Sequence, residues 1–235
     1  MHSLGYTSVP ALLKYLRHAE SLGMDLDAAL QAAGLERSQL SDNSQRLPSE
    51  AHERLLEHLS THSGDALFGL HAARFVQPGS WSVLGYITMN CANLGEAIGR
   101  IIPYEKLVGD MGVSRLEPGE DHIKLIWNCR HEAAPIRRHM VENVLASWLL
   151  YARWIADTQG SPQEVWFEHA QPDGTDIAEY EHLFGCPVRF EQPFSALLVP
   201  LHLLSYPLRQ ADANLLRTLE AVSYTHLTLP TIYSV

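Results

Sequence analysis

The sequence predicts an α+β fold, in which a helical N-terminal part precedes a small mixed or antiparallel sheet with one long buried helix. Apolar residues recur with the period of amphipathic helices over most of residues 1–110, and short alternating runs typical of strands begin near residue 111. The strongest helical pattern, at 135–157, carries apolar residues on more than one side. Such a pattern is typical of a helix that is covered on both sides.

Helix-start residues followed by glycines divide the N-terminal part into short helices. The expected helices begin after Ser8, Asp25, Pro48, Asp65 and Asn93. Gly23 and Gly34 end the first two, because glycine readily adopts the left-handed conformation found after a helix. Pro103 is expected to kink or interrupt the last of these helices near its end.

The second half of the chain alternates strand and helix patterns. Residues 113–117 and 122–128 read as a hairpin, because the linking segment Glu-Pro-Gly-Glu-Asp is turn-forming and apolar residues alternate in the second run. The expected helices are 135–157, 176–184 and 207–220, and the further strands are 164–168, 188–192 and 196–199. We therefore expect one domain over residues 1–220, with a helical part at about 1–110 and an α/β part at about 111–220.

Residues 221–235 differ in character from the preceding helix. The segment 222–235 contains no Asp, Glu, Lys or Arg and is rich in threonine and β-branched residues. Two interpretations stay open: a natural tail or edge strand, or a segment that is not native to this protein. We favour the second, and no function is assigned to these residues.

Composition and charge exclude several classes of protein. With 46% hydrophobic and 19% charged residues, the chain is neither disordered nor fibrous, and no apolar run reaches the roughly 18 residues of a membrane helix. No secretory signal opens the chain, and three widely spaced cysteines fit buried thiols in a reducing compartment, so a cytoplasmic location is expected. Seventeen Lys and Arg against 27 Asp and Glu give a formal net charge of -10, which argues against nucleic-acid binding by these residues.

No catalytic, metal or cofactor site is predicted. His58 and His62 stand four residues apart on an expected helix, but no third ligand can be placed beside them. Nucleophile elbows, dinucleotide fingerprints and phosphate-binding loops are missing from the sequence. Residues 26–40 resemble a helix-turn-helix, but their second half offers only Arg37 as a cation, and a plain helical hairpin is the prediction.

Aromatic residues mark the candidate ligand site. We expect Trp127 on the hairpin and Trp148 on the long helix to form its walls, together with Tyr86 and Tyr104. Small-molecule sites combine an apolar lining with a few polar anchors, and Arg138 is the predicted anchor for an anionic group. The alternative is that these aromatic side chains simply pack in the core.

Several stretches together resemble the N-terminal ligand-binding (effector) domain of AraC/XylS-type bacterial transcription regulators. Their order along about residues 1–220 is more specific than any one of them. The stretches are LP at 47–48, GDALFGL at 64–70, GSWSVLGY at 79–86, NLGEA at 93–97, FGCPVRF at 184–190, FSAL at 194–197, LLSYPL at 203–208 and AD at 211–212.

The resemblance implies an effector-binding, regulatory and dimerisation domain that binds a small molecule and is not an enzyme. In that family a C-terminal helix-turn-helix module binds promoter DNA, and residues 222–235 are too short and too uncharged to be that module. We therefore expect a sensor half without its DNA-binding half, which pairs with a second copy of the chain as a homodimer and has no membrane partner. A stand-alone small-molecule-binding or protein-interaction module is the alternative.

Overall fold

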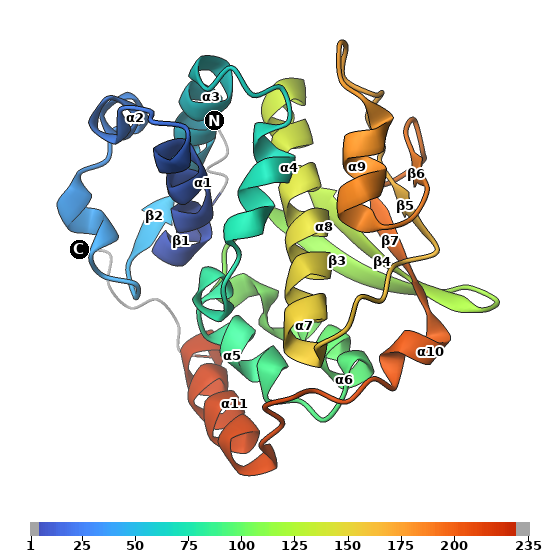
Figure 1. The fold of residues 1–235 in the computed structure, drawn as a ribbon. Coiled ribbons are helices and arrows are strands. Elements are labelled where there is room, and N and C mark those ends of the chain that lie inside the picture. Colours follow the sequence, from blue (N-terminus) through green and yellow to red (C-terminus); the bar gives the residue numbers. More distant parts are fainter. Residues whose placement is uncertain (1–4, 229–235) are drawn as a thin grey trace.

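The structure, a computed structural model, describes residues 5–228, with side chains up to residue 223 (Figure 1). The four predicted helices up to residue 72 are present, but the fourth begins only at Phe68, three residues after the predicted start signal Asp65. They are α1 (Val9–Ser21), α2 (Leu26–Ala33), α3 (Ser49–His62) and α4 (Phe68–Ala72), followed by a 3-10 turn at Ala73–Phe75. The Asp25 carboxylate accepts hydrogen bonds from the amides of Asp27 and Ala28, and Gly34 ends α2 with a φ of 70°.

Two short strands missing from the sequence-based assignment join this helical group to the rest of the chain. Strands β1 (Tyr6–Ser8) and β2 (Arg46–Pro48) pair antiparallel, and Thr7 also bridges to Gly109. Three residues are too few to show an alternating pattern. The predicted helical hairpin at 26–40 is wrong, because only a 3-10 turn, Arg37–Leu40, follows α2, and Arg37 pairs there with Asp27.

The middle of the chain forms three short helices. They are α5 (Val83–Met89), α6 (Leu94–Gly99) and α7 (Ile101–Tyr104), with 3-10 turns at Pro78–Trp81 and Glu105–Leu107. Asn93 caps α6 as predicted, by accepting a hydrogen bond from the Glu96 amide. The helix predicted after Asn93 is interrupted at Arg100, before Pro103, and Pro103 lies inside α7. No helix is predicted from the sequence at the position of α5.

A five-stranded mixed sheet confirms the predicted α+β class. Its order is β3-β4-β7-β5-β6, and only the β5–β6 pair is parallel. The predicted hairpin is β3–β4, in which Leu116 pairs with Leu125. The strands are β3 (Gly112–Pro118), β4 (His122–Cys129), β5 (Glu164–Trp166), β6 (Val188–Arg189) and β7 (Ala196–Pro200).

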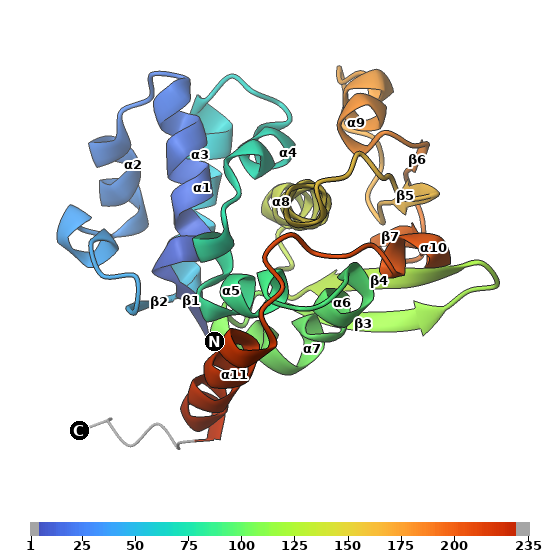
Figure 2. The ribbon, with the colours of Figure 1, turned by 60° about the horizontal axis from the view of Figure 1, so that its bottom comes forward.

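Helix α8 (Ala134–Ala156) runs between the N-terminal helices and the sheet. Figure 2 shows it end-on, with α4 on one side and α9 (Ile177–Phe184) and the sheet on the other. Buried residues on different sides of the helix, such as Met140, Val141 and Leu145, belong to the main core cluster. The burial on several sides that the sequence predicted for 135–157 is confirmed.

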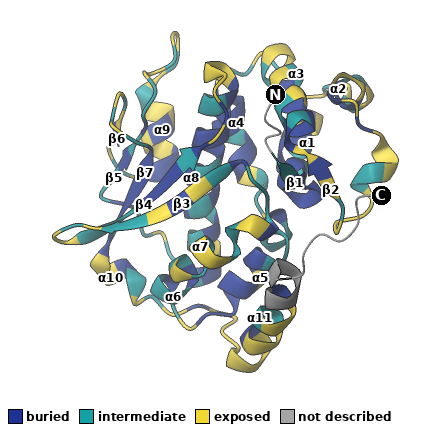
Figure 3. Ribbon diagram, turned by 180° about the vertical axis from the view of Figure 1, so that it is seen from behind, coloured by how far each residue is buried: buried dark blue, intermediate teal, exposed yellow. Residues whose placement is uncertain are grey.

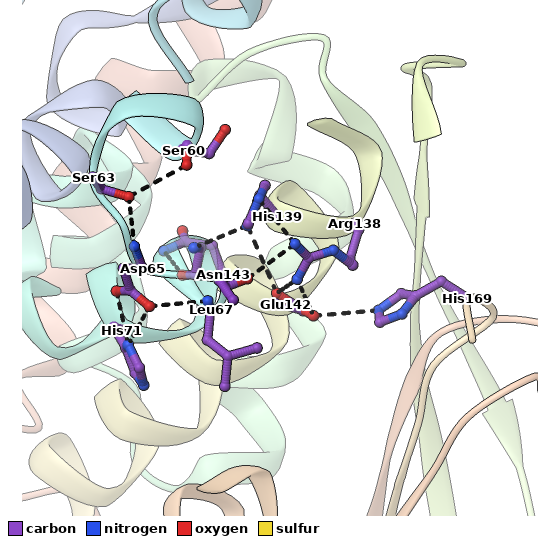
Figure 4. Close-up of polar contacts among 12 residues, drawn as sticks. Ser60, Ser63, Asp65, Leu67, His71, Arg138, His139, Glu142, Asn143 and His169 are labelled. Carbon is purple, nitrogen blue, oxygen red and sulfur yellow. Dashed lines mark hydrogen bonds and ion pairs between the residues drawn. The ribbon is translucent and has the colours of Figure 1, made fainter. Parts of the chain in front are cut away.

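The centre of α8 also carries buried polar groups, which Figure 4 shows. The Glu142 carboxylate is fully buried and accepts hydrogen bonds from the Arg138 guanidinium (3.1 Å to each oxygen) and from the Tyr180 hydroxyl on α9 (2.5 Å). The Asn143 amide donates to the Gly69 carbonyl on α4 at 2.8 Å. These contacts tie α8 to the elements on both sides of it.

The C-terminal part returns across the far end of α8. Helix α10 (Leu201–Leu204) follows β7, and α11 (Ala213–Thr228) carries mostly exposed residues (Figure 3). The helix predicted at 207–220 thus begins later and continues into the proposed tail, whose residues 229–235 lie outside the described residues. A foreign origin of residues 221–235 stays a prediction. Within residues 5–228, no helix is long and apolar enough to cross a membrane.

Gly69 is where α4 approaches α8 most closely, and replacing it with alanine tests that contact. A Cβ at residue 69 would lie 2.2 Å from the His139 carbonyl oxygen, so the two helices would have to separate. We expect Gly69→Ala to lower the free energy of unfolding by about 3 kcal/mol, measured by urea denaturation. Gly99→Ala, where a Cβ meets nothing within 4 Å, is the control and should be neutral or slightly stabilising. Equal effects of the two substitutions would contradict the close contact.

Glu142 should make stability depend on pH in a defined direction. Burial raises its pKa from 4.5 to about 7, against the lowering effect of Arg138. A carboxyl whose folded-state pKa is raised contributes most below its unfolded pKa, and this contribution is lost as pH rises from 4.5 through 7. Relative to Glu142→Gln, the wild type should therefore lose about 3 kcal/mol of stability between pH 4.5 and pH 8.

Chemical denaturation across this pH range measures the difference. Glu181→Gln, which removes an exposed carboxylate on α9, serves as the control and should give a difference from wild type that hardly changes with pH. A wild-type protein that gains stability relative to Glu142→Gln as pH rises would show that Glu142 is ionised throughout.

Candidate functional site

Two neighbouring cavities lie between α8, the hairpin and the helices around it. Their volumes are about 100 Å³ and about 90 Å³. Both are lined by the same four apolar residues, which therefore form a wall between them: Trp81, Leu84, Ile101 and Trp148. Because the wall consists of side chains from separate elements, a molecule that occupied both cavities would contact several parts of the fold at once.

The first cavity, called the apolar cavity here, has almost only hydrocarbon around it. Leu94 and Ala97 of α6 line one side, Leu149 and Ala152 of α8 another, and Leu197 of β7 a third. Tyr151 also lines this cavity, but its hydroxyl donates to the Gly85 carbonyl at 2.6 Å. The cavity therefore suits an apolar group.

The second cavity, called the polar cavity here, contains ionisable groups from three elements. Lys14 comes from α1, His52 from α3, and Glu105 from the turn that precedes the hairpin. Burial lowers the pKa of Lys14 to about 7, and burial together with the charge of Lys14 lowers the pKa of His52 to about 3. Burial raises the pKa of Glu105, whose carboxylate accepts a hydrogen bond from the Ser114 amide at 2.8 Å.

The structure brings together two of the predicted site residues. Trp127 on β4 and Trp148 on α8 both line the polar cavity. Tyr86 instead points outwards on α5, where it is 47% exposed and lines an open groove with Trp154. Tyr104 packs against the core cluster formed around α5 and α6 and lines neither cavity.

Arg138, the predicted anion anchor, does not lie with the two tryptophans. Its guanidinium is held by the Glu142 carboxylate and by the Ala66 carbonyl at 3.0 Å (Figure 4). Trp148 lies roughly 15 Å further along the axis of the same helix, at 1.5 Å per residue. The i,i+4 spacing of Arg138 and Glu142 is itself a sequence signal for this pair.

Lys14 and His52 are the site residues that sequence reasoning missed. A single lysine on an amphipathic helix normally indicates a solvated position. One signal could have found it, because Lys14 stands three residues after buried Ala11 and four before buried His18, on the inner side of α1.

One group of side chains has the residue types of a metal site. His18 Nε2 lies 2.9 Å from Asp65 Oδ2, and His71 Nδ1 also lies 2.9 Å from this oxygen. Ligand atoms around tetrahedral zinc are roughly 3.3 Å apart, so these separations are those of hydrogen bonds. Burial of Asp65 opposes its charge, but the two histidines outweigh it and hold its pKa below the ordinary value. His58 and His62 stack on each other, and His62 bonds the His58 carbonyl.

Comparisons with known proteins identify one similar sequence and one similar structure. A curated relative, the ornithine utilization regulator of Pseudomonas aeruginosa, is 26% identical over 152 residues, which are 63% of this chain and 43% of that protein. The chain thus spans less than half the length of this relative. A solved structure, the transcriptional regulator CdpR from Pseudomonas aeruginosa, shares the fold with a TM-score of 0.62 at 16% identity, over 84% of this chain and 60% of that one.

A family model matches most of the chain. The family model described as the N-terminal arabinose-binding domain of the AraC transcription regulator matches residues 23–208. This range includes α2 to α10, and with them the wall of the two cavities. The chain belongs to this family of N-terminal, effector-binding domains of AraC-type transcription regulators.

Proposed function

We propose that this domain binds its small-molecule effector in the apolar and polar cavities and that the occupied state controls an attached DNA-binding module. The observation that carries the proposal is the shared wall around Trp148 of α8, since residues of the helical layer and of the hairpin line the cavities beside it. A regulator of this type acts on promoter DNA in the cytoplasm and pairs with a second copy of itself.

Effector binding acts on the fold through the elements that line the cavities. Lys14 belongs to the helical layer, Trp127 to the sheet and Trp148 to the helix between them. A ligand that contacts all three stabilises the arrangement in which they lie at the right distance, and disfavours other arrangements. The effector binds the two arrangements with different free energies. This difference is the coupling free energy that is available to change the DNA-binding module.

The proposed role is one of binding rather than catalysis. It follows from the family match, which is to an effector-binding domain of transcription regulators. The relative named as an ornithine utilization regulator suggests that nitrogenous carboxylic acids are one class of molecule to test.

Promoter binding belongs to a module with a different charge. The chain carries a formal net charge of -10, and its Arg37 is paired with Asp27 rather than available to phosphates. We expect residues 1–235 to leave duplex DNA unshifted in a mobility assay at about 0.15 M salt. An AraC-type relative with its helix-turn-helix module is the positive control. Salt-sensitive binding at micromolar concentration would contradict the assignment.

Filling the apolar cavity tests the effector site. Ala152 lies on α8 and lines this cavity, so Ala152→Leu places a larger side chain in it without disturbing the helix. Compounds of a metabolite library that raise the melting temperature of the wild type should bind the variant at least tenfold more weakly, measured by calorimetry. Exposed Ala178 on α9 provides the matched control, Ala178→Leu, which should bind them unchanged. Compounds that bind Ala152→Leu as tightly as wild type would place the effector site elsewhere.

A further inference from the structure

Lys14 is a buried cation without a charged partner. Its side chain comes from the inner side of α1 into the polar cavity, and the residue is only 4% exposed. Within residues 5–228 it makes no hydrogen bond or ion pair, and its Nζ lies 5.5 Å from the centre of the Tyr15 ring. Buried charges are normally paired with an opposite charge. Lys14 lacks such a negatively charged partner.

Two partly buried arginines on α8 show the contrast. Arg138 is bound by Glu142, and Arg137 by Glu168 at 2.5 Å. Lys14 shares its cavity with Glu105, yet that carboxylate is bound by the Ser114 amide and forms no ion pair with the lysine. His52 lies in the same cavity with its Nε2 atom buried and without a hydrogen-bond partner. Two nitrogen groups are thus available to an oxygen ligand.

The polar cavity has an apolar continuation on the other side of the Trp148 wall. A ligand with its charge at Lys14 could therefore place a hydrocarbon or aromatic part against Trp81, Trp148 and Ile101. The combination of one cation and a long apolar lining favours a molecule with one acidic end.

We propose that Lys14 binds the carboxylate of the effector and that the effector is a small carboxylic acid whose apolar part lies against the Trp148 wall. This inference rests on the proposed function and specifies its ligand. A monoanion fits better than a phosphate ester, because a dianion would need a second cation and the described residues of the polar cavity contain no arginine beside Lys14.

Protonation of Lys14 is part of the binding. Burial lowers its pKa to about 7 in the free protein, and a bound carboxylate favours the charged form. Affinity for the acid should therefore be constant below pH 7 and fall by about tenfold per pH unit above it. The other ionisable side chains that line this cavity are those of Tyr15, His52 and Glu105. Tyr15 and His52 stay neutral over this range, and Glu105 acts equally in wild type and Lys14 variants.

Matched pairs of probes test the proposal on the unmodified protein. The acids are hydrocinnamate, hexanoate and L-phenylalanine, and each is compared with its amide, which has the same shape but no negative charge. Calorimetry at pH 6.5 should give at least one acid that binds tenfold or more tightly than its amide. If every amide binds as well as its acid, or no acid binds, the proposal is wrong.

Two variants identify Lys14 as the responsible group. Lys14→Met keeps the volume but removes the charge, so it should abolish the preference for the acid and its loss above pH 7. It should also raise the melting temperature of the free protein, because an unpaired buried charge is removed. Arg17→Met is the matched control: it removes a cation from the same helix, but one that lines the outer groove with Trp154, and it should leave acid binding unchanged.

The results separate this inference from the proposed function. Library compounds that lose binding in Ala152→Leu, but bind wild type and Lys14→Met equally, would keep the effector site and overturn the role of Lys14. Acid binding that depends on Lys14 but not on Ala152 would keep the carboxylate contact and overturn the extension into the apolar cavity. An acid preference that survives in Lys14→Met would assign the anion to another group.

Discussion

The enclosure of α8 between two layers is the constraint on which the rest of the fold depends. A helix covered on several sides needs apolar residues around most of its circumference, and Met140, Val141 and Leu145 provide them. Buried polar groups on such a helix are normally hydrogen-bonded as well. Glu142 finds Arg138 and Tyr180, which explains why α9 packs where it does. On the opposite side, α4 approaches closely only because residue 69 is a glycine.

The same enclosure accounts for the position of the two cavities in which we propose that the effector binds. Side chains that interdigitate along α8 leave the two cavities where three elements meet rather than two, around Trp148. A cavity at such a junction is coupled to the relative position of the layers, whereas one inside a single layer is not. The polar contacts of Glu142 lie on the same helix, and Met140 and Val144 on either side of it line the polar cavity, so the buried polar network and the cavity share one stretch of α8.

Local signals in the sequence predicted most helices and the hairpin, because a capping Asp25 with Gly34, or alternating residues before and after a Pro-Gly turn, act over a few positions. Strands of three residues such as β1 and β2 carry no such signal and exist through their pairing. Of the site, Trp127 and Trp148 followed from the periodicity of their elements. The orientation of Tyr86 depends on how α5 packs, which the sequence does not show. The burial of Lys14 is apparent only from the elements that cover α1.

Arg138 and Lys14 show why the residue type of a cation does not reveal its role. Both are largely buried, and both could bind an anion. Arg138 meets its carboxylate within the chain, one helical turn away, so the pair is complete without a ligand and contributes to the packing of α8. Burial also disfavours the charged form of Lys14, but no carboxylate within the described residues forms an ion pair with it. An unpaired buried lysine does not stabilise the free domain. Its position is explained if the negative charge that would pair with it belongs to the proposed ligand. Ligand binding then stabilises the arrangement of the layers around Lys14.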